Sequence, residues 1–380
     1  MSVQVHHRLL VINSGSSSLR LALFERQVDN FIEIRSERFD TLGEDQAVLL
    51  RNFIHAHHID DTVLIAHRVV HGGAHFNRAT MIDDSVIQQI ESLAPLAPLH
   101  NPLALKLIKA VASLLPAVQQ AAVFDTAFFH NLPAVARTYA IPAALSREHQ
   151  IYRYGFHGLA HEYMWQQWCG LTGNASQQGR LITLQLGSGC SIAAISNGQV
   201  LDTSMGFSPL EGLVMATRSG DLDPGILLYL QREAGYSINE LDQLLNKHSG
   251  LLGVSEHSAD MRELLATSDD AASLALDIYV YRLRKYIGAY LNVLGGAEAI
   301  VFGGGVGEHS SEIRARVLRG MGWCAIEMDK KSNDTTIATD GCISLPHSRS
   351  QVWVIRVREE LMLARAAAEL YEIKWGGEKR

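Results

Sequence analysis

The sequence predicts an α/β protein with two domains, and this prediction starts from two similar strand–turn–strand units. In residues 184–195 a short apolar strand enters a Gly/Ser turn and continues as a second apolar strand. Residues 9–23 repeat this pattern around Gly15, which precedes Gly187 by 172 residues, close to half of the chain. Glycines let such a turn close tightly, and its successive N–H groups can converge on an anion. The repeat suggests a duplicated architecture whose halves face one polyphosphate; two unrelated β-turns are the alternative.

Length and composition agree with two globular domains. The 380 residues exceed what one core usually organises, and the 47 % of apolar residues suffices for two cores. A net charge of −7 argues against non-specific binding of nucleic acid. No run of 18 apolar residues is present, which argues against a membrane span. Residues 1–8 contain no apolar signal-peptide region, so a cytoplasmic protein is expected.

The cysteines agree with a reducing compartment. Their spacing fits neither a CxxC motif nor a metal site, so reduced, partly buried thiols are expected. Cys190 follows the glycines of the second turn, and burial is a better explanation for it than nucleophilic catalysis. The four positions are Cys169, Cys190, Cys324 and Cys342.

Three segments of the N-terminal part are expected to form strands. Residues 8–26 alternate as a β-hairpin does, with the Ser-rich turn between its strands. The short apolar runs 63–66 and 121–124 are typical of buried strands. The first leads into His67–Gly73 and the second ends at Asp125, so both deliver polar residues to a strand end.

Two helices are expected between these strands. Residues 83–85 form an acidic and serine cap for a helix that ends near Leu93. Asn101 suits the N-cap of the next helix and Pro102 its first position, with the end near Leu115.

The C-terminal part predicts further strands and helices in alternation. Asn197-Gly198 is a strong signal for a type I′ hairpin turn. Ser310 or Ser311 suits the N-cap of a helix that follows a glycine run. The other expected elements are a Trp-rich helix after residue 161, strands at 192–195, 200–203, 299–302 and 352–355, and helices at 270–294, at 312–319 and from 359 onward.

Several single residues are candidates for function. Arg68 and Arg218 each lie beside a tight turn and could bind an anion, or they could be solvated surface charges. His100 and His157 could belong to a site or could be core histidines satisfied by the backbone. Asp125 is the better single candidate, because ligands and metals bind at the carboxyl ends of strands in α/β sheets.

The glycine run 303–307 follows a strand and begins a helix. It lacks the P-loop lysine, and Glu308 stands where the dinucleotide fingerprint needs glycine. A strand, a glycine run and a helix start still form an anion or nucleoside cradle; close packing alone is the alternative. Asp260-Met261-Arg262 could likewise be no more than a pair on a helix surface.

Taken together, nine segments resemble the acetate kinase family in order and spacing through nearly the whole chain. They are residues 9–23, 67–73, 97–102, 124–130, 154–161, 184–191, 203–223, 246–262 and 303–310. The resemblance implies an α/β fold of two ribonuclease-H-like domains, each with a βββαβαβα core, and ATP in the cleft between them. The expected domains are residues 1–130 with 361–380, and residues 131–360.

The resemblance also implies roles for individual residues. The catalytic set is Asp125, His157, Arg218 and Arg68. The substrate pocket comprises Arg68, Val70, Leu99, His100, Phe156 and Pro209. The nucleotide site comprises Arg20, Gln185, Leu186, Gly187, Ser188, Gly189, Asp260, Met261, Arg262, Gly305, Val306, Gly307, Glu308 and His309. Asn13 and Glu359 would hold Mg²⁺, with Mn²⁺ as a substitute.

The implied reaction is reversible, direct in-line transfer of the γ-phosphoryl group of ATP to acetate, which gives acetyl phosphate and ADP. A propionate or other short-chain carboxylate kinase is the alternative. Val70 is bulkier than the alanine that propionate-preferring relatives tend to carry there, and this favours acetate. One methylene discriminates by only about 1–3 kcal/mol, so propionate is expected to react more weakly. The family also implies a homodimer that binds only small molecules, with no nucleic acid or membrane partner.

Three positions depart from the family pattern. Ser188 stands in place of the asparagine of LGNG, and His309 in place of the asparagine of GENS. Val357-Arg358 precedes Glu359 where threonine and asparagine are usual. A shorter side chain at 188 weakens the expected phosphate contact, and His309 changes the expected preference for adenine.

The implied transfer of a phosphoryl group to a carboxylate explains why arginines, and no general base, are needed. A carboxylate nucleophile has a pKa of about 4–5 and is already ionised, so it needs no general base. Arginines grip carboxylate and phosphate through two parallel bonds and stay charged. Asp125 is therefore expected to orient Mg²⁺, its waters or an arginine rather than to remove a proton. Competing interpretations are a sugar kinase or phosphohydrolase, disfavoured by the apolar pocket, and a nucleotide-binding regulator, which needs none of the catalytic set.

Overall fold

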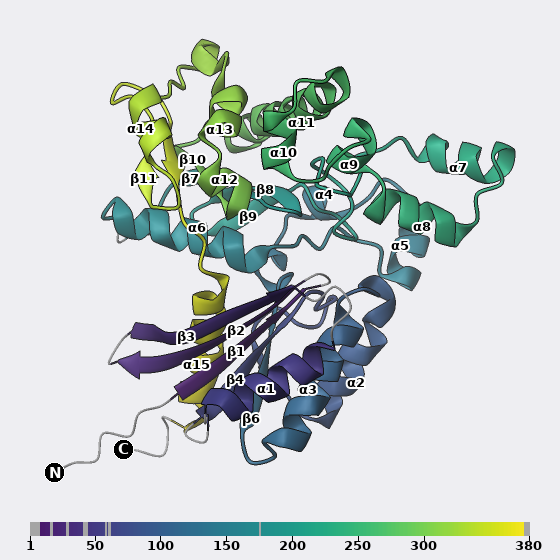
Figure 1. The fold of residues 1–380 in the computed structure, drawn as a ribbon, viewed down its shortest axis with the longest axis vertical. Helices are drawn as coiled ribbons and strands as arrows, with labels where there is room; N and C mark the ends of the chain where they lie inside the picture. Colours follow the sequence, from purple (N-terminus) through teal and green to yellow (C-terminus); the bar gives the residue numbers. More distant parts are fainter. Residues whose placement is uncertain are drawn as a thin grey trace. The chain divides into compact units, whose positions relative to one another are not determined.

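The computed structural model describes residues 8–15, 18–27, 30–40, 45–57, 59, 62–174 and 176–375, without the side chains of 371–375. Contacts divide the chain into two compact units. The first unit contains Met1–His130 and Arg358–Arg380, and the second contains Asn131–Val357. Residues 358–360, which were expected with the second domain, therefore group with the first unit. The two units are described separately below (Figure 1).

The first unit is built on a mixed sheet. Its strands are β1 (Arg8–Ser14), β2 (Ser18–Gln27), β3 (Asn30–Asp40), β4 (Thr62–Val69), β5 (Thr80–Met81) and β6 (Gln119–Phe124). Among the described residues their order across the sheet is β3-β2-β1-β4-β6-β5. The pairs β1–β2, β2–β3 and β5–β6 are antiparallel, whereas β4 runs parallel to both β1 and β6. The carboxyl ends of β1, β4 and β6 consequently meet at one edge.

Helices cover both faces of this sheet. The longer helices of the unit are α1 (Gln46–His57), α2 (Asp84–Ser92), α3 (Asn101–Leu114) and α15 (Glu359–Trp375). Successive residues of β1 point to opposite faces. Leu10 and Ile12 are buried in a core with residues of α1 and α3. Leu9 and Val11 on the other face are also buried, and α15 packs against β1, β4 and β6. The C-terminal helix therefore completes the N-terminal unit.

The second unit contains a sheet of the same kind. Its strands are β7 (Arg180–Leu186), β8 (Cys190–Ser196), β9 (Gln199–Thr203), β10 (Ala299–Gly303), β11 (Gly341–Cys342) and β12 (Gln351–Val354). Among the described residues the order is β11-β12-β10-β7-β8-β9. The strands β7, β10 and β12 are parallel, and the other pairs are antiparallel.

Helices of the second unit are distributed along the whole segment. The bounds are α4 (Ala134–Arg137), α5 (Ala143–His149), α6 (Gly158–Leu171), α7 (Pro224–Glu233), α8 (Ile238–Lys247), α9 (Gly250–Ser255), α10 (Met261–Ala266), α11 (Asp270–Leu294), α12 (Gly304–His309), α13 (Ser311–Leu318) and α14 (Lys330–Thr335). The helix α6 packs on β7 and β10, and α11 packs on β7, β8 and β9. Both helices are visible beside this sheet in Figure 1.

The two sheets have identical topology. Replacing β1, β2, β3, β4, β5 and β6 by β7, β8, β9, β10, β11 and β12 converts one order into the other, with the same parallel and antiparallel pairs. Each sheet begins with a three-stranded antiparallel meander and adds two parallel strands and a short antiparallel edge strand. The duplicated architecture that the two glycine turns suggested is therefore confirmed.

Most expected elements are confirmed with small shifts at their ends. The helix expected at 270–294 has those bounds, and Asn197 and Gly198 both have positive φ, as a type I′ turn requires. The N-cap expected at Asn101 is wrong: His100 is the cap, and Asn101 is the first helical residue. The Asn101 side chain instead bonds both backbone groups of His71, at 3.0 and 3.2 Å. The strand β3 and helix α1 were not predicted.

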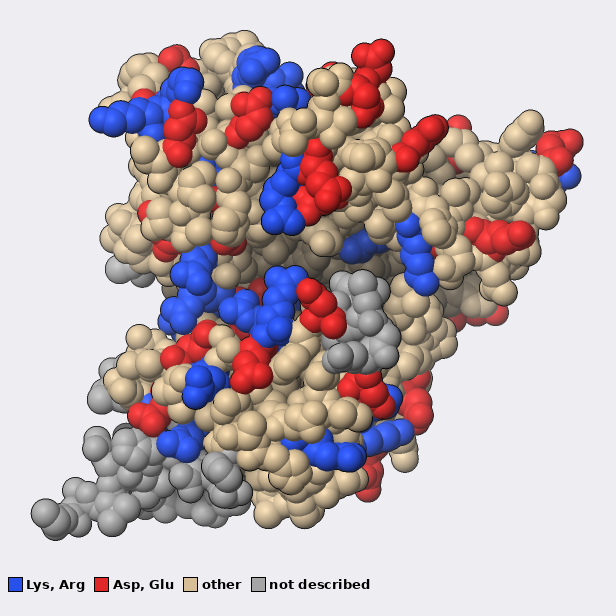
Figure 2. Space-filling model, in the orientation of Figure 1, with Lys and Arg blue, Asp and Glu red and all other residues tan. Residues whose placement is uncertain are grey.

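The described helices and the four cysteines can be set beside the predictions made from composition. Within the described helices, none combines the length and apolar character that crossing a bilayer needs. All four cysteines are free, and Cys169 and Cys190 are buried. Burial raises the pKa of the Cys190 thiol, which makes it a poor nucleophile. Lys and Arg side chains are interspersed with Asp and Glu on the face shown in Figure 2.

Candidate functional site

The first unit carries a buried ion pair at the edge where its parallel strands end. Arg68 lies near the end of β4, and Asp125 follows β6, its neighbour in the sheet. The Arg68 Nε donates to Asp125 Oδ1 at 2.9 Å, and its Nη2 donates to Oδ2 at 2.5 Å. Asp125 is 1 % exposed, and its N–H donates to the Val69 carbonyl. Parallel pairing of β4 with β6 thus brings together two residues that are 57 positions apart.

A network of polar side chains extends from this pair. The third Arg68 bond runs from Nη1 to Asn13 Oδ1 on β1, at 3.2 Å. Asn13 Nδ2 donates to Glu359 Oε2 at 3.2 Å and to Glu360 Oε1 at 2.9 Å, both at the start of α15. Arg20, the register partner of Asn13 on β2, forms an ion pair with Glu360 at 3.2 Å. Glu360, which the sequence analysis did not select, is therefore part of the cluster.

Burial and charge oppose each other in this network. Burial raises the pKa of Asp125, while the guanidinium of Arg68 acts to lower it. Burial also lowers the pKa of Arg68, but the charges of Asp125, Glu359 and Glu360 outweigh this effect and raise it. The pKa of Glu360 is raised by burial against the opposing charge of Arg20. Each buried charged group in the cluster is stabilised in its ionised form by an oppositely charged side chain.

The expected pocket residues of the first unit lie close to this edge in the chain. Val70 follows β4 and is buried, whereas Leu99 is 42 % exposed. His100 is half-buried at the N-cap of α3. The paired bonds between Asn101 and His71 join the segment after Val70 to the segment that contains Leu99 and His100.

The second unit presents its own cluster around the Gly/Ser turn between β7 and β8. The Gly187 N–H donates to the Gly189 carbonyl at 3.0 Å, which closes the turn. A Cβ atom at Gly189 would lie 2.6 Å from Arg218 Nη2 and 3.3 Å from His157 Nε2. Only glycine therefore leaves room for both side chains, and the structure brings Arg218 and His157 together over this turn.

Arg218 is a partly buried cation. Its Nη1 donates to the Pro209 carbonyl at 2.5 Å, and burial lowers the pKa of Arg218. Within the described part of the chain, no carboxylate forms an ion pair with it. A desolvated guanidinium without a counter-charge is a suitable group for binding an anion.

His157 is held in an unusual backbone conformation. It is the N-cap of α6 with φ of 60°, in the left-handed region that side chains other than glycine rarely adopt. Its ring Nδ1 is 2.8 Å from Ser191 Oγ. The preceding Phe156, expected in the substrate pocket, is 1 % exposed. This conformation turns the His157 ring toward the glycine turn.

Two of the three expected nucleotide segments meet through strand pairing. Gly303 of β10 is the register partner of Gln185 of β7. Gly304 has φ of +75°, and a Cβ there would lie 2.7 Å from the Leu186 carbonyl oxygen. The segments 185–189 and 305–309 thereby become adjacent. The Gln185 Oε1 is buried and has no hydrogen-bond partner among the described residues, so this oxygen can accept a hydrogen bond from water or a ligand.

A buried arginine that the sequence analysis missed supports this region. Arg314 on α13 is fully buried and donates to carbonyls of Gly307 and Glu308 and to Asn333 and Thr336. Burial lowers the pKa of Arg314 to about 10. Because most of its partners are backbone carbonyls, no local sequence pattern could have revealed its role.

Glu308 and His309, the last two residues of α12, bond to backbone groups of that helix and of Val357. Glu308 Oε1 accepts from the N–H groups of Gly304 and Val357, both at 3.0 Å. His309 Nδ1 is 2.9 Å from the Gly305 carbonyl, and the side chain is exposed. Glu308 therefore accepts from the N–H of Gly304, the first residue of α12, so this N–H is already satisfied within the protein.

The third expected nucleotide segment lies at the start of α10, which packs on α11. Asp260 caps this helix by accepting from the Arg262 N–H at 2.8 Å and also forms an exposed ion pair with the Arg262 side chain. These bonds lower the pKa of Asp260 to about 2. Met261 is buried beneath them. The geometry thus contains the helix surface pair that the sequence analysis weighed.

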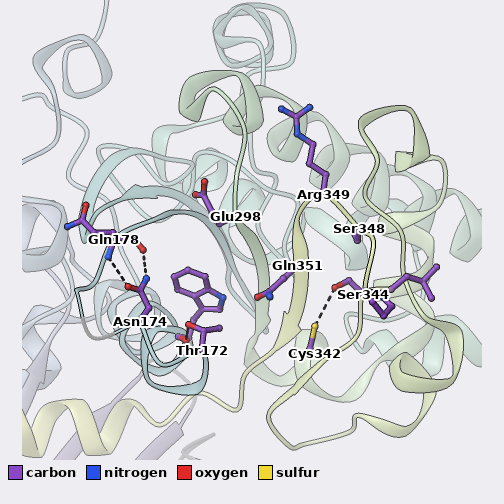
Figure 3. Close-up of a pocket in the computed structure, with 12 residues that line it drawn as sticks. Thr172, Asn174, Gln178, Glu298, Cys342, Ser344, Ser348, Arg349 and Gln351 are labelled. Atoms are coloured by element: carbon purple, nitrogen blue, oxygen red, sulfur yellow. Dashed lines mark hydrogen bonds between the residues drawn. The ribbon is translucent and has the colours of Figure 1, made fainter.

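A pocket of about 650 Å³ lies at the other end of the second sheet (Figure 3). Its lining includes Gln178, Glu298 and Gln351, which stand at the amino ends of β7, β10 and β12. None of the predicted site residues lines it. The predicted segments follow the carboxyl ends of these strands, where ligands of parallel sheets usually bind.

Comparison with known proteins shows similarity along the chain. The model of the Acetokinase family matches residues 45–365. The acetate kinase of Chloroherpeton thalassium is 50 % identical over 313 residues, covering 81 % of this chain and 75 % of that protein. The acetate kinase of Sulfurimonas denitrificans is 41 % identical over 390 residues, covering 96 % and 99 %.

Two solved structures show the same fold. The crystal structure of Porphyromonas gingivalis acetate kinase has a TM-score of 0.85 at 35 % identity and covers 96 % of this chain and 100 % of its own. The crystal structure of a propionate kinase from Francisella tularensis has a TM-score of 0.86 at 34 % identity and covers 96 % and 99 %. The structural similarity therefore covers the segments of both units.

Removal of the Arg68 charge is expected to destabilise the first unit. The Arg68→Met variant keeps most of the apolar stem but leaves Asp125 buried without its cation, which costs about 3–5 kcal/mol of unfolding free energy. Burial then raises the pKa of Asp125 unopposed, so the folded state binds more protons than the unfolded state. The deficit should therefore shrink as pH falls from 7 toward the ordinary value of Asp. Urea unfolding across this pH range measures it.

The matched control is Arg180→Met. Arg180 pairs with Glu298 at 2.6 Å, but both side chains are more than 40 % exposed. Its loss should cost less than about 1 kcal/mol. Equal losses of unfolding free energy in the two variants would contradict the prediction. So would a loss in Arg68→Met that increases as the pH falls.

Proposed function

Because the chain belongs to the acetokinase family, we propose that it transfers the γ-phosphoryl group of ATP to the carboxylate of acetate, giving acetyl phosphate and ADP. The observation that carries this proposal is the extended similarity to acetate kinases. The clustering of Arg68 with Asp125, and of His157 with Arg218, gives it a physical basis. Propionate is the second candidate substrate, because one solved relative is a propionate kinase.

We assign the binding of the acid to Arg68. A guanidinium has five N–H groups, and three of those on Arg68 are directed to Asp125 and Asn13. Two N–H groups, one on each terminal nitrogen, remain to grip a carboxylate. Asp125 fixes the plane of the guanidinium and thereby the direction of these two groups. Val70, Leu99, Phe156 and Pro209 would surround the methyl group.

We assign the phosphates to the second unit. Arg218 and His157 stand over the turn 187–189, where the charge of a phosphoryl group would be stabilised. An arginine in such a position is worth about 10³–10⁵ in rate. The expected nucleotide residues 185–189 and 305–309 form the adjoining surface, and residues 260–262 and Arg20 complete the proposed set.

The step itself needs no general base. An oxygen of the acetate carboxylate bonds to the γ-phosphorus, the bond from that phosphorus to the β–γ bridging oxygen breaks, and ADP departs with the electron pair. Arg218 and His157 stabilise the negative charge of the phosphoryl oxygens during transfer. Asp125 remains bonded to Arg68 throughout and acts as a positioning residue.

We propose that Asn13 and Glu359 hold a magnesium ion. An amide oxygen and carboxylates are the hard oxygen ligands that Mg²⁺ prefers, and it commonly takes only one or two of them from the protein. In the structure Asn13 Nδ2 donates to Glu359 and Glu360, whereas Asn13 Oδ1 accepts from Arg68, so the amide would turn its oxygen toward a bound ion. When bound, Mg²⁺ neutralises charge on the phosphate oxygens.

The four free cysteines support a cytoplasmic location.

A hydroxamate assay tests the reaction. Purified protein with ATP and Mg²⁺ should yield acyl hydroxamate from acetate, with a higher kcat/KM for acetate than for propionate. One methylene against Val70 corresponds to a preference of roughly 10–200-fold. A preference for propionate would reject the acetate assignment. No signal with any short-chain acid would reject the enzyme class. The same assay across nucleoside triphosphates measures the donor preference at Ser188 and His309.

The positioning role of Asp125 has a direct test. Asp125→Asn keeps the size of the side chain but loses the charge and one of the two acceptors for Arg68. A misdirected guanidinium should lower kcat/KM for acetate by about 100-fold. Asp83→Asn is the control, because Asp83 caps α2 and asparagine caps equally well. Turnover near that of the wild type at saturating Mg²⁺ would remove Asp125 from the mechanism.

We propose that the chain forms a homodimer through α7. No residue of this helix is buried, although Ile226, Leu228 and Tyr229 are apolar and 42, 52 and 62 % exposed. A second copy is the occupant that the family implies, and a shared apolar face is typical of two-fold interfaces.

Sedimentation velocity tests the dimer. The wild type should sediment at twice the chain mass, and the double variant Leu228→Glu/Tyr229→Glu should sediment as a monomer, because charge in an apolar interface is costly. Trp323→Glu, which alters a side chain that is 81 % exposed elsewhere in the same unit, serves as control. A monomeric wild type, or a double variant that remains dimeric, would reject this interface.

A further inference from the structure

A chain of hydrogen bonds leads from His157 into the interior of the second unit. His157 Nδ1 lies 2.8 Å from Ser191 Oγ, and the same oxygen lies 2.8 Å from His161 Nε2. The other nitrogen of His161 lies 2.7 Å from Thr183 Oγ1. His161 is one turn after His157 on α6, whereas Thr183 and Ser191 come from the adjacent strands β7 and β8. The chain therefore joins a helix to the sheet beneath the glycine turn.

The interior part of this chain is sealed from water. Ser191, His161 and Thr183 are all fully buried. Burial lowers the pKa of His161 to about 3, so this ring is neutral and carries one N–H. A neutral imidazole donates through one nitrogen and accepts through the other. Its proton position is thus coupled to the directions of both neighbouring hydroxyl groups.

Two complete arrangements of the protons satisfy the three contacts. In one, His157 Nδ1–H donates to Ser191, Ser191 donates to His161 Nε2, and His161 Nδ1–H donates to Thr183. In the other, every donor and acceptor is reversed, and Ser191 donates to a bare Nδ1 of His157. The first arrangement suits a His157 that is protonated on both nitrogens. The second suits a neutral ring that is protonated on Nε2.

Both arrangements allow the outer nitrogen of His157 to carry a proton. This nitrogen faces the turn, since a Cβ at Gly189 would lie 3.3 Å from it. A carboxylate in place of Ser191 could only accept, and it would force a neutral His157 to present a bare nitrogen to a phosphate. The Ser191 hydroxyl, which is also bonded to the neutral His161, can accept from His157 Nδ1 or donate to it. His157 Nε2 can therefore carry a proton whether the His157 ring is neutral or charged.

We propose that Ser191 and His161 are positioning residues that keep His157 Nε2–H directed at the transferring phosphoryl group. This inference rests on the proposed function, because it specifies how His157 contributes to the transfer. Neither residue touches the substrate; both act through the His157 ring. Thr183 is the last residue of this series of hydrogen bonds. Its hydroxyl can accept from His161 Nδ1 or donate to it, as each of the two arrangements requires.

The kinetic test uses matched substitutions in the buried chain. Ser191→Ala removes the hydroxyl, and His161→Phe keeps a ring of similar size without its nitrogens. Each should lower kcat by about 10–100-fold, the range seen when the hydrogen-bond partners of metal-binding histidines are lost. The KM values for acetate and ATP should change less than about twofold. Ser191→Thr, which restores a hydroxyl, should recover most of kcat.

The control separates this role from a loss of packing. Ser350 is equally buried, and its hydroxyl donates to the Ala297 carbonyl at 2.6 Å, at the opposite end of the sheet. Ser350→Ala should lower the melting temperature as much as Ser191→Ala but leave kcat unchanged. If the two alanine variants have the same kcat, or if Ser191→Ala raises KM instead of lowering kcat, the proposal is wrong.

A spectroscopic measurement tests the proposal independently of turnover. In protein labelled with ¹⁵N-histidine, long-range ¹H–¹⁵N correlations report which ring nitrogen carries the proton, and His157→Gln identifies the His157 signals. Without substrates, Ser191→Ala should change the tautomer ratio of His157, and Ser191→Thr should restore it. An unchanged ratio would overturn the proposal. An inactive wild type that still shows the change would instead reject the proposed function alone.

Discussion

The ion pair of Arg68 and Asp125 places two opposite charges where water is almost excluded. Removing such charges from water costs several kcal/mol per ion, and attraction offsets this only when the geometry and the surrounding hydrogen bonds are good. Here both carboxylate oxygens are bonded to the guanidinium, and Asn13 continues the network to the start of α15. The first unit therefore needs strands β1, β4 and β6 and the distant C-terminal helix in place at the same time.

In the second unit, the charged groups Arg218 and Arg314 are hydrogen-bonded to neutral partners. Arg218 donates to a backbone carbonyl, and Arg314 donates to carbonyls and an amide. His161 remains neutral between two hydroxyl groups. Neutral acceptors satisfy a buried cation without cancelling its charge. This difference supports the proposed roles, in which a carboxylate shares Arg68 with Asp125 and a polyphosphate binds beside Arg218.

The two sheets share one topology but differ in what their turns carry. Gly15 donates to Ser18 in the first turn, and Gly187 donates to Gly189 in the second, so both turns close through a glycine N–H. The strand that leaves the first turn carries Arg20, whereas the strand after the second turn carries the buried Ser191. The duplicated backbone thus carries different polar side chains beside equivalent strands of the two sheets.

The sequence alone determined the elements whose cause is local. Gly15 and Gly187 revealed the repeat because each follows an apolar strand in the same local pattern, and Asn197-Gly198 identified a hairpin because both residues adopt positive φ. Residues with long-range partners were decided by the tertiary structure. Asn101 suited a helix cap by local criteria, but it bonds His71, and Arg314 and Glu360 gave no local signal at all. Their roles arise from strand pairing and helix docking, which join segments that no short window of sequence contains.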